Sequence, residues 1–180
     1  MSGDNAAANF LVGACDFPYS VNTELRQTGQ TPPNWVEFPK GYPCDQLDWL
    51  KLAADRGDTE AQYRYAMYVS ETTYRLGKRV ALVPPAELAD WEANARKYLQ
   101  QAIEGGLAEA YVLLWRAYIT PSLGLTYDAV KGHACLIELV NNYSIPASRQ
   151  MLEANEKRLR PVEVEQAKLF VASGNACKAI

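Results

Sequence analysis

Histidine is almost absent from this 180-residue chain, and several signatures of catalytic or membrane proteins are missing altogether. With a single histidine, His133, and no CxxC pair, the sequence lacks the ligand set of a typical zinc site. No apolar run is long enough to span a bilayer, so we expect no membrane span. The phosphate-binding patterns GxGxxG and GxxxxGK(S/T) are also lacking. These absences predict a protein that has neither a metal ion nor a cofactor.

The charge balance argues against a nucleic-acid partner. The formal net charge is −3, whereas nucleic-acid-binding domains usually carry a clustered basic surface. Lys and Arg are scattered, and the densest cluster, RLGKR at residues 75–79, is typical of a solvated loop. An apolar content of 48% and a length suited to one domain indicate an ordinary globular protein.

The four cysteines, Cys15, Cys44, Cys135 and Cys177, are far apart in the sequence. An even number at long separations favours two disulfides formed in an oxidising compartment. Of three possible connectivities we favour Cys15–Cys44 and Cys135–Cys177, which would tie the N-terminal segment and the tail to helices. Four reduced, buried thiols are the alternative, because a free cysteine packs as a small apolar residue.

The cellular compartment that we expect depends on whether the cysteines form disulfides. The first residues, MSGDNAAANF, lack the basic and apolar regions of a signal peptide. If the disulfides form, we expect a periplasmic or secreted protein whose signal peptide is not present in this chain. If the thiols are free, we expect a cytoplasmic protein.

Residues 47–71, LDWLKLAADRGDTEAQYRYAMYVSE, carry a helix–turn–helix pattern that returns at residues 98–118. Without a gap, Leu50 aligns with Leu99, and Gly57 in the turn aligns with Gly106. Further matches fall on both sides of the turn: Ala53 on Ala102, Glu60 on Glu109, and Ala61 on Ala110. Self-similarity at one fixed offset is the signature of a helical repeat.

Apolar residues at helical spacing predict an all-α fold, and no segment alternates in the way that a strand does. The expected helices cover residues 45–56, 60–76, 85–104, 108–119, 127–141, 147–159 and 161–171. Residues 1–43 contain five prolines and predict an irregular capping segment. Residues 44–180 are expected to form one helical repeat domain, with units at 45–76, 85–120 and 127–159 and a closing helix at 161–173.

The matched segments resemble Sel1-like repeats, which are α/α units related to tetratricopeptide repeats. The first unit carries the pattern at Trp49, Ala53, Ala54, Gly57, Ala61, Tyr65 and Ala66, and the second at Ala95, Tyr98, Ala102, Gly106, Ala110 and Leu114. A partial third unit has Gly124, Asp128 and Ala129, with His133 at the aromatic position. Trp115 stands where Gly or Ala is usual. The resemblance implies a short right-handed α/α solenoid whose first helices line a concave surface that binds proteins or peptides.

Repeat register assigns eight residues to this expected surface: Glu60, Tyr63, Met67 and Ser70 in the first unit, and Glu109, Val112, Arg116 and Ile119 in the second. Tyr, Met and Arg are enriched at protein interfaces. A solvated helix face is the alternative for any single position. No catalytic residue is predicted, because His133 has no recognisable nucleophile motif and the two glutamates suit the helix dipole of a first turn.

We therefore expect a non-enzymatic protein-binding module of an exported bacterial type. By analogy with the family, the concrete hypothesis is an immunity protein that binds and inhibits a toxic secreted effector such as a lipase. An adaptor or regulator of envelope signalling is the alternative within the same class. The alternative from another class is a β-lactam-binding or β-lactam-hydrolysing enzyme of the cysteine-rich Sel1 type. The chain lacks the S-x-x-K motif and the cysteine pair within each repeat that would support it.

Overall fold

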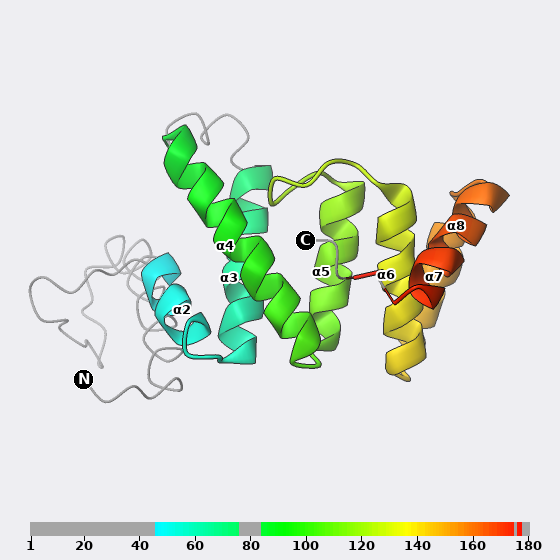
Figure 1. Cartoon of the computed structure of the whole chain (residues 1–180), viewed down its shortest axis with the longest axis horizontal. Helices are drawn as coiled ribbons and strands as arrows, with labels where there is room; N and C mark the ends of the chain where they lie inside the picture. The colour runs from blue at the N-terminus through cyan, green and yellow to red at the C-terminus, as the bar shows by residue number, and fades with distance from the viewer. Residues whose placement is uncertain (1–45, 76–83, 175, 178–180) are drawn as a thin grey trace, which may run out of the picture.

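In a computed structural model, which describes residues 46–75, 84–174 and 176–177, the helices extend from α2 at one end to α7 and α8 at the other, and α4 crosses in front of α3 in this view (Figure 1). Within these residues every regular element is helical and none is a strand, which confirms the predicted all-α class. The helices are α2 (Gln46–Ala54), α3 (Thr59–Arg75), α4 (Pro85–Glu104), α5 (Ala108–Ile119), α6 (Ala129–Asn142), α7 (Pro146–Glu156) and α8 (Pro161–Ala172). The predicted capping segment 1–43, Cys15 and Cys44 lie outside the described residues.

Each predicted helix is present, and the differences are confined to the ends. The largest difference is in α7, which ends at Glu156 rather than at residue 159. Proline begins α4, α7 and α8, where its fixed φ suits a first turn and its missing N–H leaves no donor unpaired. Asp58 is the N-cap of α3, because its carboxylate accepts a hydrogen bond from the N–H of Ala61 at 2.8 Å.

The α2–α3 turn and the α4–α5 turn have the same backbone geometry. Gly57 and Gly106 both have positive φ, at 88° and 84°, which only glycine adopts without strain. The N–H of Gly57 donates to Ala54 and the N–H of Gly106 to Ile103, each at 3.0 Å. The next N–H in each turn reaches back to Ala53 and Ala102, at 3.2 and 3.0 Å. Both helices therefore end in the Schellman motif, and the sequence repeat is also a structural repeat at its turn.

Equivalent apolar positions of the two helix pairs are buried in one core. Leu50 and Leu99 are 1% and 0% exposed, and the alanines aligned across the repeat are fully enclosed. The ring of Tyr65 meets the edge of Tyr98 at a centroid distance of 5.0 Å and an interplanar angle of 78°, which joins α3 to α4. The apolar cluster continues through α5 into α6. Because alanine side chains are small, the helices that carry these buried alanines can pack closely.

The chain turns back after α8. Ala176 and Cys177 are buried against α6, at 1% and 2% exposure. Figure 1 shows this final segment running from α8 across α6 toward α5. No helix in the described part of the chain is both long and apolar enough to cross a membrane.

Candidate functional site

A groove of about 610 Å³ lies between α3 and α5. Its walls are the facing sides of these two helices, and the loop after α5 closes one end. We call it the α3–α5 groove and define it by its lining residues: Tyr63, Met67, Ser70, Glu71, Glu109, Val112, Leu113, Trp115, Arg116, Ile119, Thr120 and Ser122.

Helical spacing explains why these residues share the groove. On α3 the lining positions recur at intervals of three and four residues, which place side chains on one face of a helix. On α5 the same interval runs from Glu109 through Val112 and Arg116 to Ile119. The two helices have the same register: Ala61 and Ala110 stand at equivalent positions in the first turn of each helix, and both are fully buried. The repeat therefore presents equivalent faces of α3 and α5 to the same space.

The floor of the groove is apolar and its rim is polar. Met67 and Val112 are partly buried there and pack against the main core. Ile119 is also partly buried and lies near Gly132 of α6. Ser122 is buried, and its hydroxyl lies 2.9 Å from that of Ser70 in a hydrogen bond that joins α3 to the loop after α5. Glu71, Glu109, Arg116 and Thr120 are exposed and form the polar rim. An apolar floor can bury a partner's side chain, while an already bonded serine pair holds the groove wall in place.

The surroundings of Tyr63 in the groove favour its protonated form. Burial raises the pKa of this tyrosine first, and the carboxylates of Glu109 and Glu60 raise it further, against the opposing effect of Arg116. Tyr63 therefore stays protonated at neutral pH and presents a hydroxyl that can donate or accept a hydrogen bond. Two lining carboxylates against one lining guanidinium favour a partner with a basic side chain at this rim.

Trp115 carries an unpaired donor in the groove wall. Its Nε1 is buried, and no acceptor for it is found among the described residues. The same ring packs against α6, since a Cβ placed on Gly132 would lie 3.3 Å from its Cδ1 atom. A buried donor without an acceptor costs about 1–3 kcal/mol, which singles out Trp115 among the aromatic residues of this wall.

The groove brings together seven of the eight residues that the repeat register assigned to the binding surface. The exception is Glu60, which lies outside the lining and pairs with Arg64 on the exposed side of α3 at 2.8 Å. Sequence reasoning missed Glu71 on α3, Leu113 and Trp115 on α5, and Thr120 directly after α5. The three- and four-residue spacing of the two helices extends to all four of them. Sequence reasoning also missed Ser122, for which the sequence holds no signal because a loop delivers it.

His133 is packed within the protein. Its side chain is 1% exposed, and Nδ2 of Asn155 lies 3.0 Å from its Nδ1 atom. The Asn155 amide and the His133 ring are therefore hydrogen-bonded to each other inside the protein. Burial lowers the pKa of His133, with a smaller opposing effect from Glu156. The contact between the two side chains joins α6 to α7.

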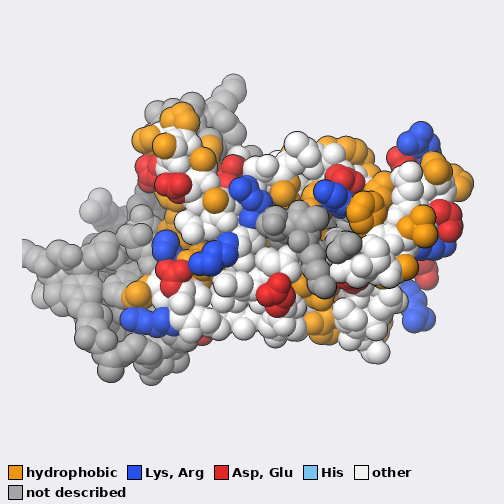
Figure 2. Space-filling model, in the orientation of Figure 1, with side chains coloured by type: hydrophobic (Ala, Val, Ile, Leu, Met, Phe, Trp, Pro, Cys, Tyr) orange, Lys and Arg blue, Asp and Glu red, His pale blue; other side chains and the backbone are white. Residues whose placement is uncertain are grey.

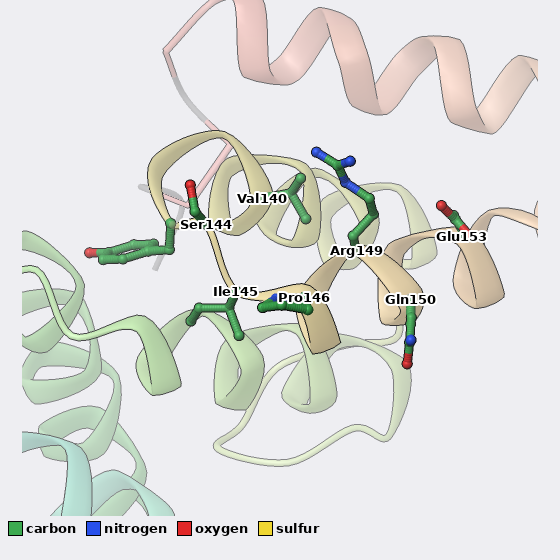
Figure 3. A pocket seen from close by; sticks show the side chains of 8 residues that line it. Val140, Ser144, Ile145, Pro146, Arg149, Gln150 and Glu153 are labelled. Atoms are coloured by element: carbon green, nitrogen blue, oxygen red, sulfur yellow. The ribbon is translucent and has the colours of Figure 1, made fainter.

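A second hollow of about 380 Å³ lies where α6 joins α7 (Figure 3). Val140 of α6, Ile145 of the connection and Pro146 at the start of α7 give it an apolar side. Figure 3 shows that Arg149 and Gln150 leave α7 on opposite sides, so these polar groups do not converge on one point. Binding sites for small molecules usually have convergent polar groups, which makes this hollow the weaker candidate.

Basic and acidic side chains are interspersed on the face of the molecule in Figure 2. Neither sign forms a continuous stripe over the helices on that face. This distribution differs from the basic footprint that nucleic-acid-binding surfaces present.

Comparisons with protein-family models and with curated proteins find no match for this chain. The Sel1-like resemblance therefore has only the repeat pattern of the sequence as its support.

Proposed function

We propose that the chain is a non-enzymatic protein-binding module of the Sel1-like type, and that the α3–α5 groove holds a helical segment of its partner. The observation that carries the proposal is the groove itself. Two equivalent helices present the same face to a single hollow with an apolar floor and a charged rim. This is the arrangement in which a helix lays its apolar side into a groove and is read at intervals of three and four residues.

The groove has the composition of a protein interface. Aromatic residues, Met and Arg are enriched at the centres of interfaces, and Tyr63, Met67, Trp115 and Arg116 line this hollow. Its polar groups are spread along the rim, with Glu71 and Glu109 from different helices. A spread rim suits an elongated peptide better than a compact small molecule, whose recognition needs convergent groups.

Charge defines the partner further. Because the carboxylates outweigh Arg116 around Tyr63, a partner helix should place Lys or Arg beside the glutamates and an apolar side chain over Met67. The Sel1-like resemblance supports a concrete version, in which the chain is an exported immunity protein that binds and inhibits a toxic effector such as a secreted lipase. An adaptor or regulator of envelope signalling would use the same groove.

The test compares three forms of the full chain as bait for a partner. In one, Tyr63→Ala and Arg116→Ala remove two side chains of the groove. In the matched control, Tyr127→Ala and Arg149→Ala remove the same residue types from exposed positions outside it. We expect one protein to be retained by the parent and by the control and lost from the groove variant, with equal helical circular dichroism. Equal retention by all three forms would place binding elsewhere.

Two further measurements address the class of function. The purified chain is expected to turn over no ester, peptide or β-lactam substrate, and turnover of any of them would contradict a purely binding role. For the immunity hypothesis, co-expression with an effector encoded beside this chain should restore growth of the host. Unrelieved toxicity with the parent chain would favour the adaptor.

A further inference from the structure

Two cysteines that are far apart in the sequence meet where the final segment folds back on the helices. Cys135 lies in the middle of α6, and Cys177 follows α8. Their exposed fractions are 0% and 2%, so both side chains are buried. The thiol of Cys135 donates to the carbonyl oxygen of Ala176, 3.8 Å away. This contact holds the residue directly before Cys177 against α6.

The two thiols are neighbours in one apolar cluster. Hydrogen bonding with Cys135 is the largest cause that raises the pKa of Cys177, followed by burial. Cys135, Cys177 and Tyr118 of α5 belong to the same buried apolar cluster, and both cysteines add to the effect of burial in raising the pKa of Tyr118. The carboxylate of Glu138, which is also on α6, raises the pKa of Cys177 as well. Both cysteines are free thiols in the structure.

We propose that Cys135 and Cys177 form a disulfide that fastens the segment after α8 to α6 when the protein meets a disulfide oxidant. The oxidant is a small disulfide or a dithiol–disulfide oxidase. Cys177 lies outside the helices while Cys135 is held within α6, so the tail makes the first attack. Burial slows this attack until the tail opens, because only the thiolate reacts.

The exchange balances in two steps. The Cys177 thiolate attacks one sulfur of the oxidant, and the other sulfur leaves as a thiol. The Cys135 thiolate then attacks the mixed disulfide at the Cys177 sulfur and releases the second thiol. Two cysteine thiols are oxidised to one disulfide, the oxidant is reduced to two thiols, and the two cysteine protons end on those thiols.

The bond would enclose α7 and α8 in a covalent loop that begins and ends at α6. Since α6 packs against α5, the bond would also hold the helix that forms one wall of the α3–α5 groove. The proposal stands whether or not the groove binds a partner. Two thiols that pack only as small apolar side chains would form no such bond.

The test uses the full chain with Cys15→Ser and Cys44→Ser, in which Cys135 and Cys177 are the remaining thiols. The folded protein is incubated with oxidised glutathione and alkylated in denaturant, and its intact mass is measured. We expect no alkylation and a mass lower by two hydrogens, with full alkylation after reduction. Two alkylated thiols, or two glutathione adducts, would overturn the proposal.

Cys135→Ser in the same background is the matched control, because its remaining thiol has no intramolecular partner. Oxidation should raise the midpoint of thermal unfolding of the parent and leave that of the control unchanged. If the doubly substituted chain does not fold, the unaltered chain is oxidised and digested. A peptide pair that joins Cys135 to Cys177 supports the proposal, and its absence overturns it.

Discussion

Replacing Gly57 or Gly106 by alanine is expected to lower the free energy of unfolding by about 1 kcal/mol in each case. The two residues have φ of 88° and 84°, where a Cβ clashes with the backbone of its own residue. Neighbouring residues add no steric clash to this cost. A Cβ at Gly57 would meet no atom within 4 Å, and one at Gly106 would meet only the hydroxyl of Tyr143, at 3.7 Å. The cost is therefore the same local strain at both turns.

Thermal and urea unfolding of the two variants measure this cost. For a chain of this length, 1 kcal/mol corresponds to a fall of about 2–4 °C in Tm. Gly57→Asn and Gly106→Asn are the controls, because asparagine adopts positive φ more readily than alanine and should cost about half as much. If an alanine variant is as stable as the parent, or if the two sites differ several-fold, the turns are not equivalent and the structural repeat is wrong.

Three other substitutions test the core. The stability of the parent should fall as pH falls below about 6.5, because the folded-state pKa of His133 is lowered and the unfolded chain therefore binds more protons in this range. His133→Gln should abolish this loss of stability. Urea titrations at pH values from 7 to 5 measure the difference. Tyr98→Phe keeps the buried ring but removes its hydrogen bond to Asp55, which should cost about 1 kcal/mol in the same assay; a cost near zero would mean that water replaces the tyrosine fully. Leu114→Ala, at a position with 0% exposure, should cost about 2–5 kcal/mol, whereas Leu169→Ala at 69% exposure should change stability by less than about 0.5 kcal/mol. Equal effects of the two leucine substitutions would contradict the placement of the core.

Local rules were sufficient to predict the helices and their turns. The helix ends depend on short-range chemistry, such as Asp58 accepting from the third residue of its own helix. The turn at Gly106 follows from one glycine and from the Schellman bond, in which the N–H of Leu107 donates to the carbonyl oxygen of Ala102, five residues before it. The end of α7 was predicted less well, because no glycine stands there to fix the stop.

The groove was predictable only to the extent that it lies on helix faces. Tyr63 and Met67 follow from the spacing of α3, and Arg116 follows from the aligned register of α5. Ser122 could not be found in this way, because its position depends on the path of the loop after α5. Glu60 was assigned to the groove by register alone; it is not among the lining residues, and it pairs with Arg64 on an exposed part of α3.

Trp115 shows why a departure from a repeat pattern is hard to interpret within one unit. A tryptophan where Gly or Ala is usual should separate two helices that would otherwise lie close together. The compensation comes from α6, where Gly132 leaves the space that the ring needs: a Cβ there would lie 3.3 Å from Trp115 and 3.4 Å from Ile119. The large residue and the missing side chain belong to different units and meet only after packing. The same packing that admits the ring also places Trp115 in the wall of the α3–α5 groove, so the exception to the pattern becomes part of the proposed binding surface.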